Sequence, residues 1–350
     1  MSGSPTLIVS YSGVLGGSER ILLDCASRLP SPAVVACPEG ALARAVRAAG
    51  IEHAPLPERA LRVRGARAAH ARALASLARD TAALSARHAP RALVAWGARA
   101  VLAAAVIPRS RRPPLLAVHM DLLPSRPVGA AVRWASRRAD GATAASQAIA
   151  DAVGAAGVLH PGVDLTAWTP KPLPPADPPR ALVLAALVPW KRPDLALEAA
   201  ARVPGLELEL AGAPMPGDGD RLVRELEARA AAPDLAGRVT FLGALDDPRP
   251  ALARAHCLLH CADAEPWGLA LVESLAAGRP VVAADAGGPR EIVGDGAGSL
   301  FAPGDAGAAA AALHAVLADR SAPAAARARA ERFAVEASAA RFAAAVEAIT

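Results

Sequence analysis

Short apolar runs alternate with alanine-rich helical stretches along almost the whole chain of 350 residues. The first runs are TLIVSY, AVVAC, ALVAW and LLAVH, and stretches such as SERILLDCASRL come between them. Apolar runs of strand length that are separated by helices are typical of parallel strands buried on both faces. The pattern therefore predicts an α/β fold in which helices cover both faces of parallel sheets.

A proline-rich segment divides this pattern in two. TPKPLPPADPPR, residues 169–180, carries six prolines and can form neither a helix nor a central strand. The alternation then restarts with ALVLAAL, LELELAG, RVTFLG and PVVAA. We expect two doubly wound, Rossmann-like domains that face a cleft, with ligands at the carboxyl ends of the strands.

The formal charge is also divided between the two halves. Residues 1–160 hold 20 arginines and nine acidic residues, a net of about +11, which leaves about −6 for the remainder of a chain whose total is +5. The chain has 36 arginines but only two lysines, Lys171 and Lys191. Because arginine supplies nearly all the positive charge, a lysine is a stronger indication of function than an arginine in this chain. Lys171 lies in the proline-rich segment and needs no role.

One basic run stands out in the sequence ERALRVRGARAAHARA. Its arginines are Arg59, Arg62, Arg64, Arg67 and Arg72. Such runs are usually solvated faces of a helix and a loop. The alternative is a patch, Arg59–Arg72, that attracts an anionic acceptor or an acidic membrane surface. Nucleic acid is a weaker candidate because no aromatic residues interleave with the arginines to stack on bases.

The sequence indicates a cytoplasmic protein. MSGSPTLIVS lacks the basic stretch and long apolar run of a signal peptide. The most apolar segment, RALVAWGARAVLAAAVIP, has Arg99 at its middle, so we interpret it as a strand and a helix rather than a membrane span. The four cysteines show no disulfide-dense spacing, which favours a reducing compartment. A peripheral position at the inner membrane is compatible with these observations.

Two features of the first half could bind a ligand. Gly16 and Gly17 follow the first strand in SGVLGGSER, where the backbone can turn tightly and a helix N-terminus favours an anion. A tight turn without function fits this glycine loop equally well. His119 ends the strand LLAVH, at the edge where ligands bind, although a lone histidine is more often structural.

In the second half, Lys191 and Arg192 follow the strand ALVLAAL, where a cation can meet a phosphate. HCLLHCAD, residues 256–263, suggests a metal site at first. Along a strand, however, its two histidines share one face and its two cysteines the other, so the four cannot converge on one ion. We therefore predict no metal.

Two glutamates in EPWGLALVESLAAG are the strongest indication of a functional site in this sequence. Glu265 lies in a loop after a strand, and Glu273 lies in the second turn of an apolar helix that begins near Gly268 and Leu269. The amides at this helix N-terminus form an anion site. An ionised carboxylate among leucine and valine is costly unless it has partners, and the paired hydroxyls of a ribose would supply them.

Glu265-x7-Glu273, with PWG after the first glutamate and SLAAGRPVVAADAGGPREIV after the second, resembles the signature of the retaining glycosyltransferases of family 4, which have the GT-B fold. The resemblance extends over nearly the whole chain. It includes the glycine loop at Gly16 and Gly17, SQAIAD at 146–151, HPGVD at 160–164 and VPWKRPDLALEA at 188–199.

This resemblance implies transfer of a sugar from a UDP-, GDP- or dTDP-sugar to the hydroxyl of a small-molecule or lipid-linked acceptor, with retention, by front-face attack, and with no metal or other cofactor. Such chemistry belongs to bacterial secondary metabolism or to cell-envelope glycan synthesis. The residues implied in catalysis are Glu265, His119 and Lys191. Those implied in donor binding are Glu273, Arg192, Gly268, Leu269, Gly16, Gly17 and Trp267.

The resemblance also implies an arrangement of domains. Residues 1–168 would form an acceptor-side domain, 169–180 a linker with a hinge near it, and 181–332 the nucleotide-sugar domain. Residues 333–350 would form a helix that crosses back to the first domain.

One departure from the family pattern bears on the diphosphate site. Many members have an arginine where this chain has Ala186, and Arg192 is a candidate replacement. Two other functions remain open: a GT-B sugar-nucleotide epimerase, and a nucleotide-sugar-binding protein without turnover, which Ala186 favours.

Overall fold

A computed structural model describes residues 3–58, 67–123, 125–175, 177–215, 219–294, 296–319 and 321–350, with the backbone alone for 67–70. The chain forms two compact units. The first contains residues 1–162 and 335–350, and the second contains residues 163–334. Each unit is built around one sheet whose strands are all parallel.

The first unit holds a seven-stranded sheet in the order β3-β2-β1-β4-β5-β6-β7. Its strands are β1 (Thr6–Val9), β2 (Ala33–Pro38), β3 (Glu52–Leu56), β4 (Ala92–Trp96), β5 (Leu115–His119), β6 (Gly141–Ala144) and β7 (Gly157–Val158). All the residues of β4 and β5 are buried, as their uninterrupted apolar sequences predict.

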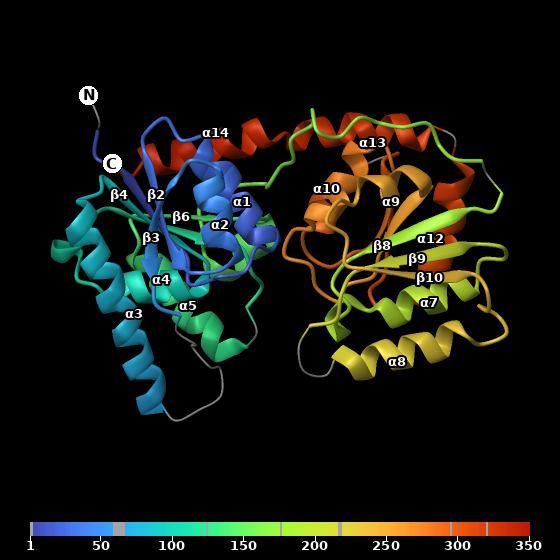
Figure 1. The fold of residues 1–350 in the computed structure, drawn as a ribbon, viewed down its shortest axis with the longest axis horizontal. Helices are drawn as coiled ribbons and strands as arrows, with labels where there is room; N and C mark the ends of the chain where they lie inside the picture. The colour runs from blue at the N-terminus through green and yellow to red at the C-terminus, as the bar shows by residue number, and fades with distance from the viewer. Residues whose placement is uncertain are drawn as a thin grey trace. The chain divides into compact units, whose positions relative to one another are not determined.

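Helices cover this sheet. They are α1 (Gly17–Ser27), α2 (Ala41–Ala48), α3 (Arg67–His88), α4 (Ala98–Ala105), α5 (Arg126–Arg138), α6 (Gln147–Val153), α14 (Val335–Glu347) and the short 3₁₀ helix η1 (Arg109–Arg111). Figure 1 shows α14, in red, beside the blue helix α1, which it contacts. The ring of Phe342 on α14 meets that of Trp96 edge-on, with centroids 5.9 Å apart. The last helix therefore belongs to the first unit.

The second unit holds a six-stranded sheet in the order β10-β9-β8-β11-β12-β13. The strands are β8 (Arg180–Leu184), β9 (Glu207–Ala211), β10 (Val239–Gly243), β11 (Cys257–His260), β12 (Val281–Ala284) and β13 (Gly298–Phe301). The helices are α7 (Pro193–Ala201), α8 (Gly219–Ala230), α9 (Arg249–Arg254), α10 (Leu269–Ala276), α11 (Pro289–Ile292), α12 (Ala306–Ala318) and α13 (Ala322–Ala330), with 3₁₀ helices η2 (Pro189–Lys191) and η3 (Glu331–Phe333). A core cluster of mainly alanine, leucine and valine joins one face of this sheet, which includes Leu208 and Leu210, to α7 and α12.

The division between the units falls after Gly162, whereas the sequence-based boundary was placed at residue 168. The reason is that two arginines of the second unit bind the segment that follows. Arg327 donates to the carbonyl of Trp168 at 2.8 Å. The fully buried Arg279 donates to the carbonyls of Lys171 at 2.8 Å and Pro172 at 3.0 Å. The proline-rich segment is therefore fixed to the second unit rather than being a free linker.

In the described part of the chain, no helix has both the length and the apolar surface needed to cross a membrane. The apolar segment around Arg99 forms β4 and α4, as the charge at its middle predicts.

Candidate functional site

Glu265 is a buried carboxylate just beyond the carboxyl end of β11, with 6% of the residue exposed. Its Oε2 accepts a hydrogen bond from Lys191 Nζ and a second from His260 Nε2 at 2.8 Å. Burial by itself would raise the pKa of Glu265, but the hydrogen bond and charge of His260, together with the charge of Lys191, outweigh it and lower the pKa to about 2. The carboxylate is therefore ionised, and both of these donors reach the same oxygen.

Lys191 ends the short helix η2, in the loop that follows β8. Its Nζ lies 4.2 Å from the centroid of the Trp190 ring, so a cation–π contact adds to the ion pair with Glu265. The amide of Asp263 donates to the carbonyl of Trp190 at 2.9 Å. The two loops that carry Lys191 and Glu265 are thus joined through their backbones.

Gly287 and Gly288 allow a third loop to approach Glu265. The amide of Gly288 donates to the carbonyl of Glu265 at 2.9 Å. A Cβ atom on Gly287, whose φ is +92°, would lie 2.3 Å from the Glu265 carbonyl oxygen, and one on Gly288 would lie 2.3 Å from that of Trp267. These two glycines had no role in the sequence-based prediction, although paired glycines signal close backbone approach.

The N-terminus of α10 lies next to Glu265. Gly268 is the residue that precedes the helix, with φ +103°, and a Cβ atom there would lie 3.3 Å from Glu265 Cγ. Leu269 is the first helical residue, and the half-buried Glu273 follows in the second turn. The ring of Trp267 is buried and packs edge-on against Phe333 at 5.4 Å. Trp267 thereby holds the loop from inside the unit, rather than presenting its ring to a ligand.

Arg192 does not present an unpaired cation. Its guanidinium donates to Asp194 Oδ2 at 2.9 Å and to Asp263 Oδ1 at 3.0 Å. The hydrogen bond to Asp194, followed by that to Asp263, raises the pKa of Arg192. Two carboxylates therefore balance the charge of Arg192, the candidate replacement for the arginine that the resemblance implies at position 186.

His119 lies at the carboxyl end of β5 in the first unit and is 2% exposed. Burial lowers the pKa of His119 to about 4, so the ring is neutral at pH 7. Its Nε2 lies 2.9 Å from Ser136 Oγ, which donates its single hydrogen to the carbonyl of Val132 at 3.1 Å. Nε2 is then the donor to Ser136, and Nδ1 is left as an acceptor. No sequence signal pointed to Ser136.

The glycine loop also belongs to the first unit. Gly16 precedes α1, and its amide donates to Glu19 Oε2 at 3.1 Å. A Cβ atom on Gly17 would have no neighbour within 4 Å, so space is open there. A cavity of about 120 Å³ adjoins the loop. It is lined by Ser10, Tyr11, Ser12, Ser18, Glu19, Trp96, Gly97, Ala98, Arg99 and Asp121.

Two other sequence features, HCLLHCAD and the basic run, form no further site among the described residues. His256 Nδ1 accepts from the amide of Arg180 at 2.9 Å, while His260 is bonded to Glu265, so the two histidines of HCLLHCAD have separate partners. Over the residues that the structure covers, no three His, Cys, Asp or Glu side chains cluster as metal ligands. Of the basic run, Arg59, Arg62, Arg64 and the side chain of Arg67 lie outside the described residues. Arg72 is exposed on α3.

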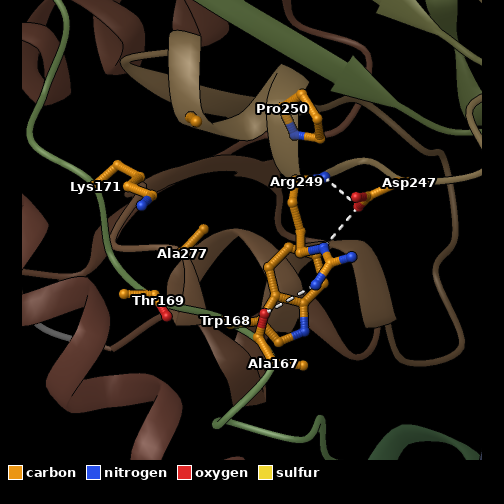
Figure 2. Close-up of a pocket in the computed structure, with 9 residues that line it drawn as sticks. Ala167, Trp168, Thr169, Lys171, Asp247, Arg249, Pro250 and Ala277 are labelled. Carbon is orange, nitrogen blue, oxygen red and sulfur yellow. Dashed lines mark hydrogen bonds and ion pairs between the residues drawn. The ribbon is translucent and has the colours of Figure 1, made fainter.

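A larger cavity of about 320 Å³ lies elsewhere in the second unit. Figure 2 shows Lys171 and Thr169 on one side of it and the ion pair of Arg249 and Asp247 on the other. The residues that line it include none of those expected to bind the donor. The cavity is therefore distinct from the cluster around Glu265.

The two parallel-sheet units define the GT-B fold of glycosyltransferases. The chain superposes on Anabaena HepE, whose structure was determined in complex with UDP and glucose, with a TM-score of 0.81 and 26% sequence identity over 98% of this chain and 99% of that one. The fold prediction is thereby confirmed.

Sequence comparisons agree with this fold. Residues 165–333 match the family "Glycosyl transferases group 1". The chain is 36% identical to the lipopolysaccharide core biosynthesis glycosyltransferase LpsE of Rhizobium meliloti over 148 residues. This aligned region covers 42% of each protein. It is 41% identical to a phosphatidyl-myo-inositol mannosyltransferase of Mycolicibacterium smegmatis over 123 residues, and this region covers 34% of this chain and 30% of that protein. The matches thus span less than half the length of these curated relatives.

Proposed function

We propose that the protein is a retaining glycosyltransferase that moves a sugar from a nucleoside-diphosphate sugar to an acceptor hydroxyl without a metal ion. The observation that carries the proposal is the buried cluster of Lys191, His260 and Glu265 next to the N-terminus of α10. It combines a cation, helix amides and an ionised carboxylate, which are the groups that a departing diphosphate and a sugar require.

Lys191 and the amides at Gly268 and Leu269 stabilise the leaving group in this mechanism. The bond between the anomeric carbon and the phosphate oxygen breaks, so negative charge grows on the diphosphate. A fixed ammonium and a helix N-terminus favour that charge, as a divalent ion would in other transferases. Position 186 is alanine and Arg192 is held by two carboxylates, whereas Lys191 has one carboxylate that it shares with His260. Lys191 therefore supplies most of the side-chain charge.

The two glutamates bind different parts of the donor. Glu265 uses Oε2 for Lys191 and His260, which leaves Oε1 to accept from a sugar hydroxyl. Glu273, one turn into α10, accepts from the ribose hydroxyls. Both roles require ionised carboxylates, and the lowered pKa of Glu265 meets that requirement.

In the first unit, neutral His119 acts as a hydrogen-bond partner of the donor sugar rather than as a cation. The backbone at Gly16 and Gly17 adjoins the phosphates. The acceptor hydroxyl attacks the anomeric carbon from the face that the diphosphate leaves, and the departing phosphate oxygen takes the hydroxyl proton. The chain then needs no nucleophile of its own, and the configuration is retained.

The comparisons suggest the classes of substrate. HepE was solved with UDP and glucose, which makes a UDP-sugar the first donor to test, before GDP- and dTDP-sugars. LpsE is named for lipopolysaccharide core biosynthesis, and the mycobacterial relative is named a phosphatidyl-myo-inositol mannosyltransferase. We therefore place the acceptor among cell-envelope glycans or lipid-linked sugars, and the protein at the cytoplasmic side of the membrane.

The test is release of nucleoside diphosphate with and without acceptor, in the presence of a chelator. We expect acceptor-dependent release that the chelator leaves unchanged, and a product with the donor's anomeric configuration by NMR. Release without any acceptor would favour a hydrolase, and a changed sugar configuration in the donor with no net release of diphosphate would favour an epimerase.

A nucleotide-sugar-binding protein without turnover is the second candidate, because Ala186 and the pairing of Arg192 reduce the charge around the diphosphate. Calorimetric binding of UDP-sugar with no transfer to any envelope fraction would favour it over our proposal.

A further inference from the structure

A fully buried arginine, Arg279, holds together the segments that line the cavity of about 320 Å³ in the second unit (Figure 2). It donates to the carbonyls of Lys171 at 2.8 Å and Ala253 at 2.9 Å, two residues that line the cavity. It also donates at 3.3 Å to the carbonyl of Gly278, which follows the lining residue Ala277. The proline-rich segment, α9 and the end of α10 are thus fixed to one another, so the cavity is formed before any ligand enters it.

Positive charge gathers around this cavity without carboxylate partners. Arg279 donates to backbone carbonyls alone. Arg327 does the same, and the carbonyls of Trp168 and Ala276 each accept from it at 2.8 Å. Among the residues that the structure describes, neither arginine forms an ion pair, and nor does Lys171 at the cavity wall. Burial lowers the pKa of Arg279, because the charged guanidinium loses hydration that no carboxylate replaces. An anion in the cavity would supply the missing countercharge.

The side of the cavity opposite Lys171 carries a single carboxylate (Figure 2). Asp247 Oδ1 accepts from the amide of Arg249 at 3.0 Å and from Arg249 Nε at 2.8 Å. Its other oxygen, Oδ2, has no hydrogen-bond partner in the described part of the chain, so it can accept from a ligand hydroxyl. Because this ion pair is neutral overall, it leaves the charges of Lys171, Arg279 and Arg327 uncompensated.

The walls between these charged groups are largely apolar. They are formed by Trp168, Pro250, Ala253 and Ala277. A volume of about 320 Å³ is more than a single ion fills, and it lies near the lower end of the range for small-molecule sites. The ligand should therefore have an anionic group for the cations, a hydroxyl for Asp247, and an organic body whose C–H groups contact the apolar walls.

We propose that this cavity binds a small phosphorylated sugar, with its phosphate at Lys171, a ring hydroxyl at Asp247 Oδ2 and its apolar ring face against Trp168. A phosphate monoester carries a charge of about −1.5 to −2 at pH 7, which suits the excess of cations. An aromatic carboxylic acid would balance only one of these charges and would offer no hydroxyl to Asp247. The cavity is distinct from the cluster around Glu265, so the proposal does not rest on the transfer chemistry.

The experiment is calorimetric titration of the full chain with glucose 6-phosphate, and separately with glucose and with inorganic phosphate. We compare the wild type with Lys171→Gln, which removes an exposed charge and leaves the backbone carbonyl that Arg279 binds. The matched control is Arg224→Gln, at an exposed position of α8 in the same unit. Losing a charge-assisted hydrogen bond should raise the Kd for glucose 6-phosphate about 10-fold or more in Lys171→Gln, and less than about twofold in the control.

A second variant tests the contact with the sugar. Asp247→Ala should weaken the binding of glucose 6-phosphate about 10-fold and should not weaken that of inorganic phosphate. No binding of glucose 6-phosphate to the wild type, or equal effects of Lys171→Gln and its control, would overturn the proposal. So would inorganic phosphate binding as tightly as the sugar phosphate. Binding that survives Lys171→Gln but is lost in Lys191→Ala would place the probe at the cluster around Glu265 instead.

Discussion

His260 Nε2 and Glu265 Oε2 form a buried hydrogen bond of 2.8 Å across the turn that leaves β11. Because Glu265 is ionised, it can only accept, so the ring of His260 carries its proton on Nε2. The same oxygen accepts from Lys191, which comes from a separate loop. The histidine thus orients the carboxylate that in turn positions the lysine, although His260 is not expected to touch substrate.

Replacing Glu265 should affect both stability and turnover. Glu265→Gln leaves the ammonium of Lys191 buried beside a neutral amide, and breaking a buried pair typically costs about 3 kcal/mol or more. We expect a loss of this size in the free energy of unfolding, measured by urea denaturation, and a larger effect on kcat than on donor affinity. The matched control is Glu225→Gln, whose ion pair with Arg221 is exposed and should contribute less than about 1 kcal/mol. Equal losses in the two variants would contradict the buried pair.

Glu273 should show the opposite kinetic pattern. Its proposed partners are ribose hydroxyls, and a hydrogen bond to a charged group contributes about 1.5–3 kcal/mol. Glu273→Gln should therefore raise the Kd for UDP about 10- to 100-fold by calorimetry, with a smaller change in kcat at saturating donor. If Glu273→Gln lowered kcat alone and Glu265→Gln weakened nucleotide binding alone, the two roles would be reversed.

The strands could be predicted closely from the sequence because their signal is local. ALVAW is apolar throughout and LLAVH is apolar up to its final histidine, and they form the buried strands β4 and β5. Glu265 and Glu273 could be proposed as a site for a similar reason, since their spacing is contained in one loop and one helix. The nucleotide-sugar class followed from the resemblance, not from any single contact.

The partners of these residues could not be predicted, because they depend on side chains that are distant in sequence. Ser136 meets His119 across 17 positions, and Lys191 meets Glu265 across 74. The attachment of the proline-rich segment by Arg279 spans 108 positions. The contact of Arg192 with Asp263, 71 positions away, could not be predicted either. Long-range side-chain contacts such as these carry no periodic or composition signal.

Lys191 and Arg192 should therefore differ sharply despite being adjacent. Lys191→Ala removes the proposed cation of the leaving group and should lower kcat about 100-fold or more. Arg192→Ala removes a guanidinium already balanced by Asp194 and Asp263, and should change kcat less than about fivefold. Turnover of UDP-sugar at saturating acceptor measures both. Equal losses would show that Arg192 does replace the arginine that is absent at position 186.

The buried His119 should make stability depend on pH. Burial lowers the pKa of His119 from 6.5 to about 4, so below pH 6.5 the unfolded chain binds a proton that the folded chain does not. The stability that this residue contributes is present above pH 6.5 and is lost as the pH falls toward 4, by about 3 kcal/mol in all. Urea denaturation at several pH values should show a shallower decline in His119→Asn than in the wild type. The control His314→Asn, at an exposed position of α12, should keep the wild-type decline.

Replacing Gly287 tests whether the close approach of its backbone to that of Glu265 holds the Glu265 loop in place. In Gly287→Ala the added Cβ would lie 2.3 Å from the carbonyl oxygen of Glu265, so one of the two loops must move. Gly304 has a similar φ of +80° but open space around it, so Gly304→Ala carries only the strain of a left-handed alanine, about 1 kcal/mol. Urea denaturation should therefore show a loss at least about 2 kcal/mol larger for Gly287→Ala, and donor turnover should fall in that variant alone. If both variants lost the same stability and kept their turnover, the approach of this loop would have no part in positioning Glu265. The geometry of the carboxylate would then be set by His260 and Lys191 alone.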